Sequence, residues 1–139
     1  MRLWTFTQGH GEKEGGAVSI EINHMIVPAK DRKASARFLG DILGIEPGPV
    51  FIPHFEPLQV GGVTLDFMDS AEVQSMHIAF QVDDDTFDAA LRHFERLGTR
   101  TYADPARSQP GEINHRFGGR GVYFDDPDGH FFELMTRLP

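Results

Sequence analysis

Two histidines and one glutamate have the types and positions of a metal-ligand set: His24, His77 and Glu133. His24 shares one face of an alternating segment with Ile22 and Ile26, and His77 begins a similar segment in the second half. Glu133 lies in an apolar segment, where an ionised carboxylate needs a charge partner. Two imidazoles and one carboxylate form the facial triad that leaves open positions on Fe(II), and the same set holds Mn, Ni or Zn. The alternative is that both histidines are ordinary strand residues and Glu133 faces solvent.

Composition narrows the remaining possibilities. The chain has 139 residues and no cysteine, so a metal site must be built from histidine and carboxylate. A formal net charge of -8 argues against a nucleic-acid surface or an anionic membrane surface. No apolar run reaches the length of a bilayer span, and the N-terminus lacks a signal-peptide pattern. We therefore expect a cytoplasmic protein that binds a small molecule, with no nucleic-acid or membrane partner.

The elements that must position these residues follow one repeated order, β, α, β, β, β. In the first half, residues 19–27 alternate as a strand, residues 31–43 form an amphipathic helix that ends at Gly44, and two strands flank a tight turn at residues 61–62. In the second half, residues 76–82 form a strand, and a helix that starts at residues 83–85 ends at Gly98. His24 precedes Gly44 by 20 residues and His77 precedes Gly98 by 21.

The repeat predicts an α+β fold in which two βαβββ modules form one cupped, mostly antiparallel, eight-stranded sheet. We expect a single domain over residues 19–139, with module 1 at 19–71 and module 2 at 75–138. Residues 1–18 show no sustained period and are predicted to be a flexible lead, with a short strand at residues 3–6. Pseudo-twofold pairing of the modules would bring both imidazoles near the centre of the cup.

A longer motif carries a family resemblance. The run INHRFGGRGVYFDDPDGHFFE resembles the extradiol ring-cleavage dioxygenase signature, with His115, then Val122 and Tyr123, an acidic-Pro-x-Gly turn at 126–129, and Glu133. Together with the repeat and the two strand histidines, this run makes residues 20–137 similar to the vicinal oxygen chelate superfamily. That superfamily includes glyoxalase I, methylmalonyl-CoA epimerase, bleomycin-resistance proteins and extradiol dioxygenases, and the resemblance implies the glyoxalase/dioxygenase-like fold.

The resemblance also implies roles for single residues. His24, His77 and Glu133 would be the metal ligands, and His115 and Tyr123 would be catalytic groups beside a substrate oxygen. The competing interpretation of Tyr123 is a cross-strand packing residue. The metal would be Fe2+ in a dioxygenase and Ni2+, Zn2+, Mn2+ or Co2+ otherwise. A homodimer is implied, with modules paired within one chain or exchanged between two.

The sequence also departs from the family pattern. Asp66 stands where glyoxalase I and the epimerase usually have a fourth ligand, and it would ligate directly, bind through a water or act as a catalytic base. The additional histidine of extradiol dioxygenases is missing, because no histidine lies between His54 and His77. Arg107, Arg116 and Arg120 are expected either to bind a substrate carboxylate or to be surface charges.

The predicted function is a metal-dependent, extradiol-dioxygenase-like oxidoreductase that acts on a small vicinal-oxygen or catechol-like substrate. One alternative is a metal-dependent lyase or isomerase of the glyoxalase I or epimerase type. The other is a non-enzymatic protein that binds a drug and confers resistance.

Overall fold

The structure is a computed structural model, and it describes residues 19–139. The predicted flexible lead and its short strand fall in residues 1–18 and lie outside the described residues.

The first half of the described chain comprises β1 (His24–Ala29), α1 (Arg32–Leu43), β2 (Phe55–Val60) and β3 (Val63–Asp69). The second half comprises β4 (His77–Gln81), α2 (Asp84–Leu97), β5 (Thr101–Tyr102), the short 3₁₀ helix η1 (Arg116–Gly118), β6 (Gly121–Asp125) and β7 (Phe131–Met135). Both helices lie where the sequence predicts them.

Local chemistry explains the helix ends. The Asp31 carboxylate accepts hydrogen bonds from the first-turn amides of Lys33 and Ala34, and Asp83 caps α2 in the same way. Gly44 and Gly98 end the two helices in the left-handed conformation, with φ of 71° and 66°. Neither helix of the described chain is long and apolar enough to cross a membrane.

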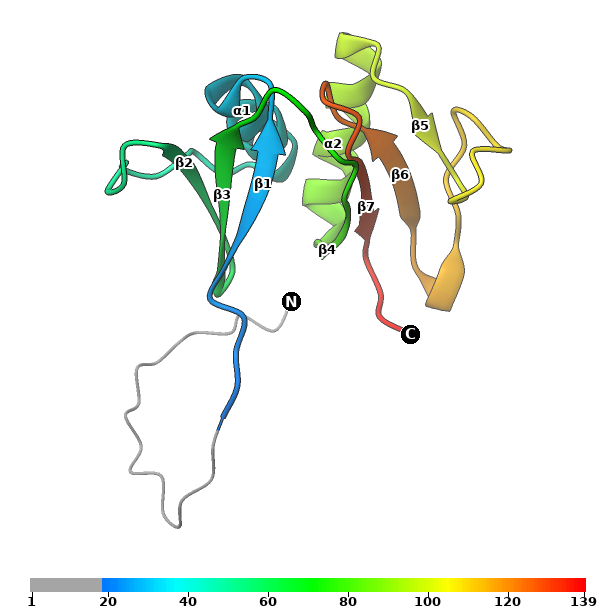
Figure 1. Cartoon of the computed structure of the whole chain (residues 1–139). Helices are drawn as coiled ribbons and strands as arrows, with labels where there is room; N and C mark the ends of the chain where they lie inside the picture. Colours follow the sequence, from blue (N-terminus) through cyan, green and yellow to red (C-terminus); the bar gives the residue numbers. More distant parts are fainter. Residues whose placement is uncertain (1–18) are drawn as a thin grey trace.

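The strands form two sheets, with orders β1-β3-β2 and β4-β7-β6-β5 (Figure 1). The first strand of each half pairs in parallel with the last strand of the same half, and all other pairs are antiparallel. The prediction of one eight-stranded sheet is therefore wrong, because residues 19–139 hold seven strands in two sheets. Residues 47–54 form no strand, since the three prolines there lack the N–H that a sheet ladder needs.

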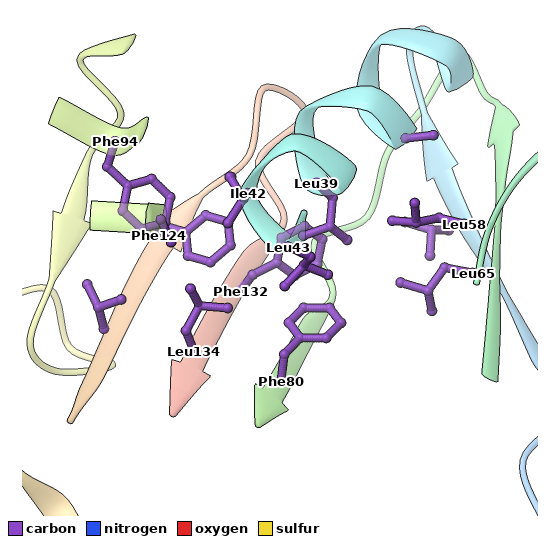
Figure 2. Close-up of a cluster of buried hydrophobic side chains, with 14 of the residues drawn as sticks. Leu39, Ile42, Leu43, Leu58, Leu65, Phe80, Phe94, Phe124, Phe132 and Leu134 are labelled. Carbon is purple, nitrogen blue, oxygen red and sulfur yellow. The ribbon is translucent and has the colours of Figure 1, made fainter. Parts of the chain in front are cut away.

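One hydrophobic core joins the two halves. Leu39, Ile42 and Leu43 of α1 lie between Phe132 of the second sheet and Leu58 of the first (Figure 2). Side chains alternate along a strand, so those opposite the core-facing residues point away from the core on each sheet. The chemically active side chains lie on these outer faces.

The turn between β6 and β7 also ties the halves together. His130 is fully buried; its Nε2 lies 2.7 Å from the Pro28 carbonyl, and its Nδ1 accepts a hydrogen bond of 2.9 Å from the Met76 amide. The Asp128 carboxylate accepts hydrogen bonds from the Lys30 amide, at 3.1 Å, and from the Ser35 hydroxyl. The turn between β6 and β7 is thus a connection between the two modules.

Candidate functional site

The second sheet brings His77 and Glu133 together. Strands β4 and β7 are neighbours, and their register sets Glu133 beside Ala79 and His77 beside Phe131. The Glu133 residue is only 7% exposed, and its Oε2 lies 3.3 Å from Nε2 of His77. The two side chains face each other on the outer face of the sheet.

The orientation of the His77 ring suits a metal ligand. Its Nδ1 lies 2.7 Å from the Phe131 carbonyl oxygen, which can only accept, so Nδ1 carries the proton. In the neutral ring, Nε2 directs a lone pair at the Glu133 carboxylate, and a shared cation would stabilise this arrangement; a protonated ring would instead form an ion pair with the carboxylate. Two ligand atoms that each lie about 2.1 Å from one ion are about 3.0 to 3.4 Å apart. The observed separation of 3.3 Å therefore fits two ligands of one ion.

Tyr123 completes this half of the site. It pairs with Glu133 across β6 and β7 and is 4% exposed, with its ring stacked 5.8 Å from the His77 ring and 5.3 Å from the Phe131 ring. Its hydroxyl accepts a hydrogen bond of 2.9 Å from Nη1 of Arg116. Burial raises the pKa of Tyr123 above 10.0, and the Glu133 charge raises it further. We call His77, Arg116, Tyr123 and Glu133 the second half-site.

His24 and Asp66 lie on the outer face of the first sheet. Strands β1 and β3 set His24 beside Thr64 and Ile26 beside Asp66. The Nδ1 atom of His24 lies 2.8 Å from the amide oxygen of Asn23, so Nε2 is again the nitrogen left for a metal.

A cavity of about 430 Å³ opens beside these two side chains. It has a polar part that includes His24, Thr64 and Asp66, and an apolar wall formed by Pro49, Phe51, Ile52, Phe55 and Pro57. No lysine or arginine lines this cavity, so an uncharged, ring-like group suits it better than a multiply charged anion. We call His24, Asp66 and this cavity the first half-site.

The two half-sites do not meet within one chain. Across residues 19–139, no three histidine, aspartate or glutamate side chains are grouped closely enough to hold a metal ion. One chain therefore brings together His77 and Glu133, but it does not bring His24 to them.

The other predicted site residues lie outside this cluster. His115 is exposed just before η1, and its side chain makes no hydrogen bond or ion pair with the described part of the chain. Arg120 instead faces α2, with its guanidinium 2.6 Å from Asp88 and 3.0 Å from Asp84.

Arg107, the third loop arginine that the sequence singles out, lies beside the second half-site. Its guanidinium lies 3.9 Å from the Phe131 ring centre and 2.9 Å from the Asp125 carboxylate. Its left-handed backbone conformation, with φ of 58°, and its position over Phe131 could not be predicted from the sequence.

Comparisons with known proteins cover most of the described chain. Residues 24–135 match a family model described as a glyoxalase-like domain. Two solved structures, "Oxidase ChaP-H2" and "Oxidase ChaP-H1", are 47% and 48% identical, with TM-scores of 0.83 and 0.82. They align with 87% and 86% of this chain and with 96% and 98% of their own chains.

Fosfomycin resistance proteins are more distant. The crystal structure of FosX from Mesorhizobium loti is 26% identical, with a TM-score of 0.64 over 87% of this chain and 95% of that chain. FosX from Mesorhizobium japonicum is 39% identical over 66 residues, which are 48% of this chain and only 42% of that protein.

Proposed function

The chain belongs to the glyoxalase-like domain family, whose members typically bind a divalent metal, and from this premise we propose that it is a metal-dependent oxidoreductase. Its substrate would be a small molecule with two adjacent oxygens, such as a catechol. The observation that carries the proposal is the pair His77 and Glu133, with a 3.3 Å contact between Nε2 and a largely buried carboxylate.

Two comparisons favour redox chemistry. The relatives named oxidases share 47% and 48% identity with this chain along nearly their whole length. The solved fosfomycin resistance protein shares 26%. The first half-site also favours a ring-like substrate, because its cavity has an apolar wall and no cationic lining.

The complete ligand set requires a second copy of the chain. Each half-site lies on an outer face, and both histidines leave Nε2 available for a metal. Strands β1 and β4 each pair with only one neighbour in the described chain, so each has a free edge. The proposed assembly is a homodimer in which His24 of one copy faces His77 and Glu133 of the other.

Each residue then has a definite task. A bound divalent ion would supply Lewis-acid stabilisation to a substrate that presents two adjacent oxygens. The Phe131 carbonyl fixes the His77 tautomer, and the buried Glu133 provides the negative charge that the cation requires. Tyr123 is buried beside Glu133 and its pKa is raised, so its phenol stays protonated at neutral pH and is a hydrogen-bond donor next to the ligand, not a base. We assign His115 no role in the reaction, because it is exposed before η1 and its side chain makes no hydrogen bond or ion pair with the described part of the chain.

Asp66 lies where it can accept a proton. Its carboxylate lines the same cavity as His24, so it can take a proton from a substrate hydroxyl or from a carbon next to a carbonyl. The second of these steps would serve the alternative function, a lyase or isomerase. The identity of the metal separates the two, with Fe2+ for the oxidoreductase and Ni2+, Zn2+, Mn2+ or Co2+ for proton transfer.

Metal analysis tests the proposal. The wild type is expected to hold about one divalent ion per chain, and His77→Ala is expected to hold none. His93→Ala is the matched control, because His93 is partly buried on α2, outside both half-sites, and contacts Arg96. A wild type that binds no metal would refute the proposal.

Oxygen uptake tests the reaction class. The Fe2+-loaded wild type should consume oxygen with at least one member of a panel of catechols, and His77→Ala should not. No uptake across the panel, in protein that holds its iron, would exclude the catechol oxidoreductase and leave the lyase or isomerase.

A further inference from the structure

Arg116 contacts Tyr123 in the second half-site. Its guanidinium donates to the neutral hydroxyl of Tyr123 and lies 5.8 Å from the ring centroid, and it forms no ion pair within residues 19–139. Four of the nine arginines in residues 19–139 pair with carboxylates, namely Arg32, Arg37, Arg107 and Arg120, so it is the contact with Tyr123 that distinguishes Arg116. A guanidinium that binds a phenol next to a buried carboxylate indicates a specific task.

The loop around Arg116 is built to hold it. Asn114 and Gly121 exchange two backbone hydrogen bonds of 2.9 Å, and the Asn114 side chain donates to the Ala103 carbonyl at 2.9 Å while it accepts from the Arg116 amide at 3.3 Å. Gly121 leaves the room for this side chain, because a Cβ there would lie 2.6 Å from the Asn114 side-chain oxygen. Phe117 follows in a left-handed conformation, with φ of 59°, which costs about 1 to 2 kcal/mol. A strained, braced loop thus presents one guanidinium to Tyr123.

The hydrogen bond from Arg116 restricts the Tyr123 hydroxyl. The guanidinium can only donate, so it occupies a lone pair of the phenol oxygen and leaves the phenol proton for another acceptor. Tyr123 is buried and pairs with Glu133 across the strands. Directly paired residues project from the same face of a sheet, so the Glu133 carboxylate is the neighbouring acceptor on that face.

We propose that Arg116 is a positioning residue that acts through Tyr123. By donating to the phenol oxygen it turns the phenol proton toward Glu133, and the carboxylate so held keeps Oε2 directed at His77. Arg116 therefore tunes the metal ligand Glu133 and does not bind the substrate. This inference rests on the proposed metal site.

A double-mutant cycle on metal affinity tests the inference. The probe is Co2+, titrated into metal-free protein and followed by its visible spectrum. Arg116→Gln and Tyr123→Phe should each weaken binding about 10- to 100-fold, as is usual when a partner of a ligand is removed. The double variant should bind no more weakly than Tyr123→Phe alone, because the two residues act as one unit. Arg116→Lys should recover part of the loss, since it retains one donor.

Arg120→Gln is the control for a loop perturbation, because Arg120 follows on the same loop but contacts α2. It should leave the Co2+ affinity unchanged. Additive losses from Arg116→Gln and Tyr123→Phe, or an Arg116→Gln variant with wild-type affinity, would overturn the inference.

A metal-free measurement keeps the inference separate from the proposed function. The chain has two tyrosines, so Tyr102→Phe leaves Tyr123 as the only one. The Raman doublet of tyrosine reports whether the phenol donates or accepts, and adding Arg116→Gln should shift it toward a phenol that only donates. An unchanged doublet overturns the positioning role even if the wild type binds Co2+. A shifted doublet in a protein that binds no Co2+ refutes the metal site but supports the contact.

Discussion

Replacing His130 with phenylalanine is expected to lower the free energy of unfolding by about 2 to 6 kcal/mol. His130 is fully buried and stacks on Phe132, with a distance of 5.8 Å between ring centres. Phenylalanine can keep this stacking, but it cannot donate to the Pro28 carbonyl or accept from the Met76 amide. Those two contacts are 2.7 Å and 2.9 Å long.

The magnitude follows from the groups left behind. The substitution leaves two partly buried backbone groups, the Pro28 carbonyl and the Met76 amide, without their side-chain partner, at about 1 to 3 kcal/mol each. Both modules should lose stability together, in one unfolding transition, because the two hydrogen bonds reach one module each. Pro28 belongs to the first module, and Met76 directly precedes His77 in the second.

Urea unfolding at neutral pH measures the effect. His115→Phe is the control, since His115 is exposed and its side chain makes no hydrogen bond with the described part of the chain, and it should change stability by less than about 0.5 kcal/mol. A His130→Phe protein within about 1 kcal/mol of wild type, with an unchanged dependence on urea, would show that the buried histidine does not join the modules.

Three further changes test other parts of the structure. Burial raises the pKa of the Asp126 carboxyl above 3.8 in the folded protein. Its contribution to the free energy of unfolding is therefore greatest below pH 3.8 and is lost as the pH rises through the raised pKa. In urea unfolding measured from about pH 4 upward, the stability of Asp126→Asn should rise relative to that of the wild type. Gly121→Ala should lower the free energy of unfolding by about 1 to 3 kcal/mol in thermal unfolding, because the new Cβ would lie 2.6 Å from Asn114. Gly48→Ala is the control and should be nearly neutral, because a Cβ at Gly48 meets nothing closer than 4.0 Å. Phe117→Gly should not reduce stability, because it removes left-handed strain and an exposed side chain; a clear loss would show that the strain estimate is wrong.

Much of the fold could be predicted from local patterns. Alternation along β4 correctly predicted that His77 and the core-facing Phe80 lie on opposite faces of the sheet. The capping aspartates and the terminal glycines predicted the ends of both helices within a residue or two. The first strand was placed too early, because Pro28 reads as a strand breaker. Proline is tolerated there since β1 pairs only with β3 and has a free edge in the described chain.

Contacts between distant residues could not be predicted in this way. His130 contacts Pro28, 102 positions away, and Met76, 54 positions away, and no local rule connects them. For the same reason, alternation placed His24 and Glu133 on sheet faces but could not show that these faces belong to separate half-sites. That outcome depends on how the shared core orients the two sheets.

A metal site shared between two copies of the chain, as proposed here, can be tested by mixing two variants that each lack one ligand. In the proposed dimer, neither His24→Ala nor Glu133→Ala alone would retain a complete ligand set in either copy. If equal amounts of the two are unfolded together and refolded, about half of the dimers would be mixed, and each mixed dimer would have one intact site. The mixture is expected to bind about a quarter of the wild-type amount of metal. A mixture that binds none, beside a wild type that binds its full amount, would show that the two copies do not share the site.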